Sequence, residues 1–179
     1  MRVISGTARG TRLVNLGSAD IRPTLDRVKE SIFNLIVHSK DFNFNLSDSI
    51  VLDLFSGSGS FGIECLSRGA KFASFVENYS PTLNVLEKNL NLISGNNYEI
   101  IDRNIFKKET YNYFTKSYDI IFIDPPFLEN KIEEIILKAL SGNDLCIPEV
   151  EKLLTARGED FEAVCFSAND LRFGSELSY

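Results

Sequence analysis

Residues 50–62 read Ile-Val-Leu-Asp-Leu-Phe-Ser-Gly-Ser-Gly-Ser-Phe-Gly, an apolar run that opens into a glycine-rich loop. The run from Ile50 to Phe55 predicts a buried strand, and the residues from Ser60 to Arg68 predict a helix. The spacing Gly57-x-Gly59-x-x-Gly62 is typical of loops whose backbone lies close to a nucleoside-type ligand. This stretch therefore predicts the first strand, loop and helix of an α/β fold with such a ligand.

Two acids narrow the choice of ligand. The next strand-like run, Phe72 to Val76, is followed by Glu77, about 20 residues after the loop, where an acid that binds a ribose diol is expected. Asp53 lies just before the loop. Its carboxylate would repel a pyrophosphate but attract the cationic sulfonium and ammonium groups of S-adenosyl-L-methionine. Because the glycine spacing alone also matches dinucleotide loops, a nicotinamide-dependent oxidoreductase stays open as an alternative.

A second motif, Asp124-Pro-Pro-Phe127, ends the apolar run that begins at Tyr118. A strand that ends in an acid places its carboxylate in the crevice above a parallel sheet, where ligands of open α/β folds bind. Neither proline has an N–H group, so this corner offers hydrogen-bond acceptors without competing donors. With the aromatic ring that follows, the motif suits a planar base that presents an amino group.

These motifs, together with two more, resemble the RsmD-type family of small-subunit rRNA (guanine-N2)-methyltransferases. The resemblance covers roughly residues 2 to 142, and its four motifs are residues 2–13, 22–34, 53–62 and 124–127. The combination of the second with the fourth is the most specific part. An Asp-Pro-Pro-aromatic motif alone equally fits an adenine-N6 or glutamine-N5 methyltransferase.

The resemblance implies methylation of the exocyclic N2 of a guanine in small-subunit (16S) rRNA, with S-adenosyl-L-methionine as cofactor and no metal. It implies a catalytic role for Asp124, Pro125, Pro126 and Phe127. The expected cofactor-binding residues are Asp53, Phe55, Gly57, Gly59, Glu77, Asn78, Asn104, Ile105, Thr24 and Arg27. The expected RNA-binding residues are Arg9, Arg12, Arg22 and Lys29. The alternatives are methylation of adenine N6 or another amino group, and a non-catalytic RNA-binding assembly protein.

Charge is distributed unevenly along the chain. The net charge of −6 is unfavourable for an RNA partner, because phosphate contacts drive such binding. However, residues 1–40 contain seven Lys and Arg against three Asp and Glu, a net charge of +4, so residues 41–179 carry −10. This asymmetry is expected when one end of a chain holds a nucleic acid. The resemblance implies that this partner is small-subunit rRNA or the assembling small ribosomal subunit.

Strand-like and helix-like segments alternate after a basic N-terminal extension. A hairpin is expected from residues 2–4 and 11–16, and a helix from a cap at Thr24 to about Val37. Strands are expected at residues 50–55, 72–77, 98–102 and 118–124, and helices at 60–68, 80–94, 106–116 and 129–140. The alternation predicts a doubly wound, mostly parallel α/β sheet, which agrees with the Rossmann-like methyltransferase fold that the resemblance implies.

We expect one domain over residues 1–179. It comprises the basic extension (1–40), a cofactor-binding and catalytic core (50–142) and a divergent C-terminal segment (143–179). In that last segment Pro148 to Arg157 looks helical and Phe161 to Ala168 has little strand character, which leaves the edge strands of the sheet open.

We expect a cytoplasmic protein that is a monomer. The chain has 179 residues, of which 44% are hydrophobic, enough to bury one α/β core. It contains no apolar stretch near the ~20 residues of a membrane span, and its start lacks the apolar core of a signal peptide. Three widely spaced cysteines, Cys65, Cys146 and Cys165, fit reduced thiols better than a disulfide framework or a metal site.

Overall fold

The computed structural model describes residues 1–15, 26–38, 45–124, 152–155 and 164–167. Within these residues, six strands form one sheet in the order β3-β2-β1-β4-β5-β6, with every neighbouring pair parallel except the antiparallel pair β5 and β6. The strands are β1 (Ile50–Leu54), β2 (Phe72–Glu77), β3 (Tyr98–Asp102), β4 (Ile120–Ile123), β5 (Lys152–Thr155) and β6 (Val164–Ser167). The predicted α/β fold with a mostly parallel sheet is confirmed.

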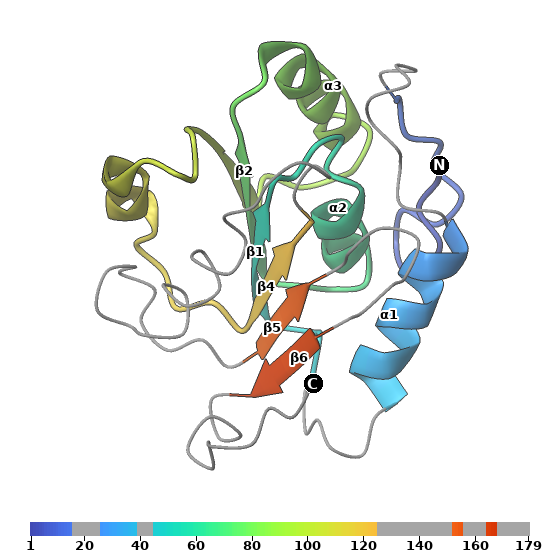
Figure 1. Ribbon diagram of the computed structural model, residues 1–179. Coiled ribbons are helices and arrows are strands. Elements are labelled where there is room, and N and C mark those ends of the chain that lie inside the picture. The colour runs from blue at the N-terminus through green and yellow to red at the C-terminus, as the bar shows by residue number, and fades with distance from the viewer. Residues whose placement is uncertain (16–25, 39–44, 125–151, 156–163, 168–179) are drawn as a thin grey trace.

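Helices lie on both sides of this sheet (Figure 1). The helices in the described part of the chain are α1 (Asp26–His38), α2 (Ser60–Ser67), α3 (Ser80–Leu90) and the 3-10 helix η1 (Lys108–Tyr113). Figure 1 shows α1 and α2 on one side of the sheet and η1 on the other. Of the helices within the described residues, none is both long and apolar enough to span a membrane.

The central strands are buried on both faces, so apolar residues alternate between two cores. The core on the side of α1 and α2 takes from these strands Val51, Ala73, Phe75, Ile120 and Phe122. The opposite core, under η1, takes Leu52, Leu54, Val76, Ile121 and Ile123. Continuous apolar runs such as residues 120–123 therefore follow from burial of both faces.

Stacked aromatic rings fix α1 and α2 on β4. The centroid of the Phe61 ring in α2 lies 3.8 Å from that of Phe122 in β4, with an interplanar angle of 7°. On its other side Phe61 stacks on Phe33 of α1 at 5.0 Å. Such contacts stabilise by roughly 0.5–1.5 kcal/mol each beyond the area they bury.

Residues 1–15, which we call the N-terminal arm, fold back on themselves. Arg2 and Arg12 form an antiparallel bridge, and the Gly10 N–H donates to the Val3 carbonyl at 2.9 Å. The expected hairpin pairing is therefore confirmed within the arm, although it is limited to a single bridge.

The arm is fixed to the end of α2 through Ser67. The Thr7 N–H donates to the Ser67 carbonyl at 2.7 Å, and the Ala8 N–H donates to the Ser67 hydroxyl at 2.9 Å. That hydroxyl in turn donates to the Ser5 carbonyl at 2.6 Å. Because these bonds join residues about 60 positions apart, the arm belongs to the folded core.

A buried carboxylate, Glu64 of α2, makes the second attachment. Its oxygens accept hydrogen bonds from the Ile4 and Ser5 N–H groups at 2.7 and 2.9 Å. Arg68 Nε lies 2.8 Å and Lys29 Nζ 3.4 Å from the same carboxylate. Glu64 therefore connects the arm, α1 and α2 at a fully buried position.

The C-terminal expectations were wrong where the structure tests them. Residues 152–155, expected to be helical, form β5, with Leu153 paired to Ile121 of β4. Residues 164–167, expected to lack strand structure, form β6. Glu, Lys, Leu and Ala favour a helix locally, but pairing with the open side of β4 outweighs this preference. The helix expected at 129–140 lies outside the described residues.

The arm attachment generates a stability prediction with a matched control. Gly6 and Gly10 both have positive φ angles, 83° and 86°. A Cβ at Gly6 would lie 1.7 Å from the Ser67 carbonyl oxygen, whereas a Cβ at Gly10 would meet nothing within 4 Å. Gly10→Ala should cost only the left-handed backbone penalty, about 1–2 kcal/mol. Gly6→Ala should cost clearly more, because the arm must leave α2.

Chemical denaturation of the two variants and the wild type measures both losses in free energy of unfolding. Equal losses for the two substitutions would contradict the close contact between arm and helix.

Candidate active site

The carboxyl ends of three adjacent strands bring the predicted site together. Leu54 at the end of β1 pairs with Val76 of β2 on one side and with Ile123 of β4 on the other. Glu77, the glycine loop and Asp124 therefore leave the sheet side by side at one edge. This is the edge where open parallel sheets bind their ligands.

The loop after β1 turns sharply. Phe55, Gly57 and Gly59 have φ angles of 59°, 56° and 76°. The Ser56 hydroxyl donates to the Asp53 carbonyl at 2.7 Å, and its N–H donates to the Val76 carbonyl at 3.0 Å. These bonds fix the start of the loop to the ends of β1 and β2.

The glycines of the loop are required for different physical reasons. A Cβ at Gly59 would lie 2.4 Å from the Leu86 side chain, and one at Gly62 would lie 2.4 Å from the Phe75 ring. These two positions let α2 and α3 pack closely on the sheet. A Cβ at Gly57 would meet only the Phe55 carbonyl, at 3.9 Å, so space is open beside this residue. Gly57 is therefore the position where a ligand can lie against the backbone.

Asp53 holds the loop from within the core. Its side chain is 1% exposed, and its Oδ2 accepts from the Gly62 N–H at 3.0 Å in the first turn of α2. Burial raises the pKa of this carboxyl well above the ordinary value, and the nearby Asp124 and Glu77 carboxylates raise it further. The bond from Gly62 partly offsets these effects. The site thus concentrates negative charge that a bound cation would relieve.

Glu77 is oriented by three backbone donors. Its Oε1 accepts from the Asn78 and Tyr79 N–H groups at 2.8 Å, and its Oε2 accepts from the Gly57 N–H at 3.0 Å. An ionised carboxylate has about four lone-pair sites. One site on Oε2 is thus left beside Gly57, where a ribose hydroxyl could donate.

Asn104 and Ile105 follow β3 at the same edge. The Asn104 side-chain oxygen accepts from the Phe106 N–H at 2.9 Å, which forms a local turn. Ile105 is 3% exposed and packs in the core under η1. The Phe55 and Phe106 rings lie beside each other, with centroids 5.7 Å apart. Because the Asn104 side-chain oxygen already accepts a hydrogen bond from the Phe106 N–H, an adenine amino group would have to use the second lone pair of that oxygen.

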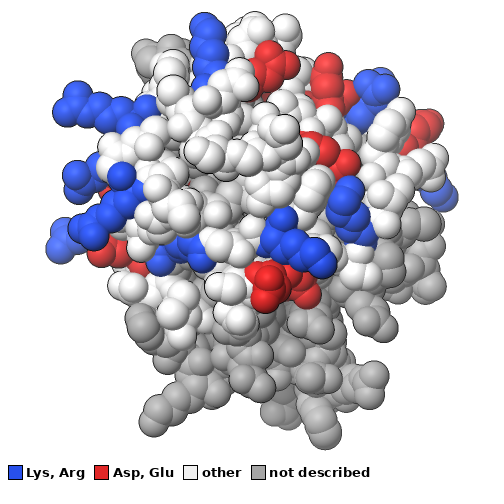
Figure 2. Space-filling view, turned by 180° about the vertical axis from the view of Figure 1, so that it is seen from behind, with Lys and Arg blue, Asp and Glu red and all other residues white. Residues whose placement is uncertain are grey.

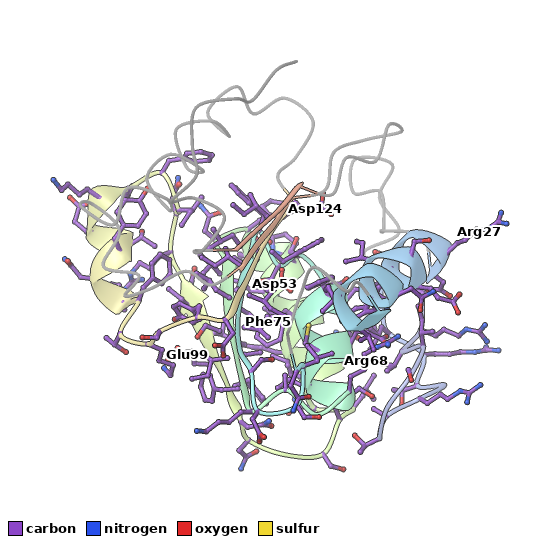
Figure 3. The ribbon with its side chains drawn as sticks, turned by 90° about the horizontal axis from the view of Figure 1, so that it is seen from below. Arg27, Asp53, Arg68, Phe75, Glu99 and Asp124 are labelled. Atoms are coloured by element: carbon purple, nitrogen blue, oxygen red, sulfur yellow. The ribbon has the colours of Figure 1, made fainter. Side chains whose placement is uncertain are left out.

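Asp124 is half-buried directly after β4. Figure 3 shows Asp53 and Asp124 in the same central region of the molecule. Pro125, Pro126, Phe127, Thr24 and Arg22 lie outside the described residues.

Two expected site residues lie elsewhere. Figure 3 shows Arg27 projecting outward from α1, on the far side from Asp53 and Asp124, so the structure does not bring it to the loop. Lys29, expected to contact RNA, is 1% exposed and is bound by Glu64, the Arg2 carbonyl and the Ser60 hydroxyl. Burial lowers the pKa of Lys29, an effect that Glu64 partly offsets. A lysine in this position holds the fold together and does not offer its charge to a phosphate.

The arginines of the arm are placed as expected. Arg2, Arg9 and Arg12 are exposed. Basic side chains project from the left edge of Figure 2, which is the edge of the arm and α1 in Figure 1. The electropositive surface expected from the sequence is thus present on the arm.

Two polar residues of the site region were not predicted. Ser56 fixes the loop, and Asn89 of α3 is fully buried with its amide bound to the arm and to the loop. A signal existed for Asn89, because it falls among the apolar residues Leu86 and Leu90, where a polar side chain requires a partner.

These features fit S-adenosyl-L-methionine on physical grounds. The open backbone at Gly57 and the remaining acceptor of Glu77 suit a nucleoside, and the acids Asp53, Glu77 and Asp124 suit a cation and disfavour a pyrophosphate. Among the described residues, no cluster of three or more His, Cys, Asp and Glu could hold a metal ion.

Comparison with known proteins also points to methyltransferases. The model of the family described as conserved hypothetical protein 95 matches residues 1–156. The ribosomal RNA small subunit methyltransferase D of Haemophilus influenzae is 39% identical over 147 residues, covering 80% of this chain and 72% of the relative. The protein of the same name from Buchnera aphidicola (subsp. Baizongia pistaciae) is 33% identical over 143 residues, covering 80% and 69%.

A solved structure agrees in fold and sequence. The protein yhhF of Escherichia coli is 30% identical and superimposes with a TM-score of 0.65, covering 87% of this chain and 79% of that one. The glycine loop with its acids and the strand order agree with these matches. The chain therefore belongs to the conserved hypothetical protein 95 family, the RsmD-type family of rRNA methyltransferases.

Proposed function

We propose that this protein transfers the methyl group of S-adenosyl-L-methionine to the exocyclic N2 of a guanine in small-subunit rRNA. The observation that carries the proposal is the arrangement of Glu77, the open glycine loop and Asp124 on three adjacent strand ends. This arrangement supports the proposal, because the Glu77 carboxylate suits a ribose diol and the neighbouring Asp124 carboxylate suits an amino group.

The bound cofactor supplies an electrophilic methyl group, and the residues supply position. Glu77 would hold the ribose hydroxyls, and Asp53 and Gly57 the methionine end of the cofactor. Asp124 would accept a hydrogen bond from the guanine amine, with the Pro125 carbonyl as a further acceptor and Phe127 stacked on the base. The amine is a weak nucleophile because its lone pair is delocalised into the ring. Alignment therefore carries the catalysis, and can supply about 7–11 kcal/mol.

The arm supports the choice of RNA as substrate. Its exposed arginines can neutralise phosphates, and the rest of the chain is acidic. We infer a monomer in the cytoplasm that acts on rRNA or on the assembling small subunit.

The direct test incubates the protein with labelled S-adenosyl-L-methionine and small-subunit rRNA or particles, and identifies the modified nucleoside by mass. The expected product is N2-methylguanosine, because guanine presents both N1–H and N2–H to a carboxylate. Formation of N6-methyladenosine instead would overturn the guanine assignment.

Asp124→Ala should abolish methyl transfer while cofactor affinity stays within about twofold of the wild type, because this acid faces the acceptor amine. Calorimetric titration with S-adenosylhomocysteine and a single-turnover methylation assay measure the two properties. Glu87→Ala, which removes an exposed carboxylate from α3, is the control and should leave both unchanged. Parallel loss of cofactor binding and activity in Asp124→Ala would contradict this division of roles.

Asp53→Asn separates the charge of the residue from its structural bond. The amide oxygen can still accept from Gly62, and a neutral group suits the buried position. Because the folded pKa of Asp53 is raised, the stabilisation from its neutral form is complete below the unfolded pKa of about 3.9 and is lost as pH rises through the folded pKa. At neutral pH the variant should therefore be at least as stable as the wild type, and this advantage should shrink toward pH 4.

Cofactor affinity of Asp53→Asn should nevertheless fall, because a negative charge near the sulfonium and ammonium groups is lost. Denaturation at several pH values and calorimetric titration provide the measurements. Undiminished cofactor affinity with lower stability would show that Asp53 serves only the fold.

Changing both Arg9 and Arg12 to Ala should weaken rRNA binding and flatten its salt dependence. Each lost phosphate contact removes about 0.7–0.9 of the slope of log affinity against log salt concentration. Turnover at saturating RNA should stay nearly unchanged. Lys107→Ala is the control, because Lys107 is exposed at the start of η1, on the other side of the sheet from α1 and α2. An unchanged slope in the double arginine variant would remove the arm from the RNA interface.

A further inference from the structure

The side chain of Asn89 joins the N-terminal arm to the glycine loop. Its Oδ1 accepts from the Val14 N–H at 2.7 Å, and its Nδ2 donates to the Val14 carbonyl at 3.0 Å. The same Nδ2 donates to the Ser58 carbonyl at 2.9 Å. Ser58 lies between Gly57 and Gly59, so one buried amide contacts both the arm and the centre of the loop.

Two further contacts make the same connection from α1 and from the chain start. Lys29 Nζ donates to the Arg2 carbonyl at 2.8 Å and to the Ser60 hydroxyl at 3.2 Å, at the start of α2. The Ser58 hydroxyl lies 3.8 Å from the Met1 sulfur. The arm thus contacts the loop directly where Met1 meets Ser58, and it is connected to the first residue of α2 through Lys29 of α1.

We propose that the arm and the glycine loop act as one unit, in which Asn89 is the positioning residue, so that cofactor binding at the loop strengthens RNA binding by the arm. This inference rests on the proposed function, because it assigns the cofactor to the loop and RNA to the arm. It adds a coupling between these two binding events.

The sign of the coupling follows from the hydrogen bonds. Asn89 is fully buried, so movement of either the loop or the arm away from it leaves buried polar atoms without partners. A ligand that restricts the loop also holds the Ser58 carbonyl against Asn89 and, through the same amide, holds Val14. RNA then binds an arm whose ordering is already complete, which gives positive cooperativity. By linkage, RNA must strengthen cofactor binding by the same factor.

The first test needs only the wild-type protein. The dissociation constant for transcribed small-subunit rRNA is measured with and without saturating S-adenosylhomocysteine, and that of S-adenosylhomocysteine with and without the RNA. Both should tighten by an equal factor of about 5 or more, the lower range of typical allosteric coupling. Tight but independent binding of the two ligands would overturn the inference and leave the proposed function standing. Failure of either ligand to bind would overturn both.

Amide hydrogen exchange locates the coupling. S-adenosylhomocysteine alone should slow exchange of the Val14 amide, which donates to Asn89. The Asp119 amide donates to the Ile50 carbonyl at the opposite edge of the sheet and serves as the reference for general stabilisation. Equal slowing at both amides, or no change at Val14, would contradict a path through Asn89.

A variant pair completes the test. Asn89→Ala removes the amide that joins Val14 to Ser58 but leaves the Lys29 and Met1 contacts in place. Asn84→Ala makes the same change on the exposed face of α3, where the amide donates to the Ser80 carbonyl. The ratio of RNA affinities with and without S-adenosylhomocysteine should fall clearly in Asn89→Ala and stay at the wild-type value in Asn84→Ala. If Asn89→Ala keeps the wild-type ratio, Asn89 is not the positioning residue. If Asn89→Ala does not fold, the wild-type titrations and the Val14 amide still decide.

Discussion

The fully buried carboxylate of Glu64 is the constraint on which the placement of the N-terminal arm depends. An ionised group at such a position loses its hydration, and it is stable only where donors replace the water. Two backbone N–H groups of the arm, together with Arg68 and Lys29, supply these donors. The arm thus supplies hydrogen bonds that replace water around the buried Glu64 carboxylate, and removal of the arm would leave this carboxylate without two of its donors.

This requirement explains how a basic surface comes to lie on an acidic protein. Arg9 and Arg12 are exposed on a chain segment whose neighbours, Ile4 to Ala8, are bound to α2. Lys29, although basic, serves the attachment itself. Among the described residues near the N-terminus, the positive charges therefore divide into the buried Lys29, which stabilises the fold, and exposed arginines that can contact a phosphate.

Much of the sheet and of the loop could be predicted from the sequence, because local pattern decides them. The runs at residues 50–54 and 120–123 are apolar since both faces are buried, and the glycine spacing reflects close packing at Gly59 and Gly62. The strands β5 and β6 could not be predicted, because their composition favours other structures. Pairing of β5 with the open side of β4, and of β6 with β5, decides them.

Side-chain roles that depend on tertiary contacts could not be predicted from the sequence either. Lys29 looks like a surface lysine until Glu64 is placed beside it, and Asn89 looks like a helix residue until the arm reaches it. Asp53 was predicted near a cation from its position before the loop. Its hydrogen bond from the Gly62 N–H, which gives it a structural role in fixing the loop, could be found only from the structure.

A crystal structure with S-adenosylhomocysteine would show whether the carboxyl ends of β1, β2 and β4 form one methyl-transfer site. We expect the ribose hydroxyls within hydrogen-bond distance of Glu77, the ligand over Gly57 and the sulfur facing Asp124. A ligand bound at another edge of the sheet, or one whose sulfur points away from Asp124, would rule out this site.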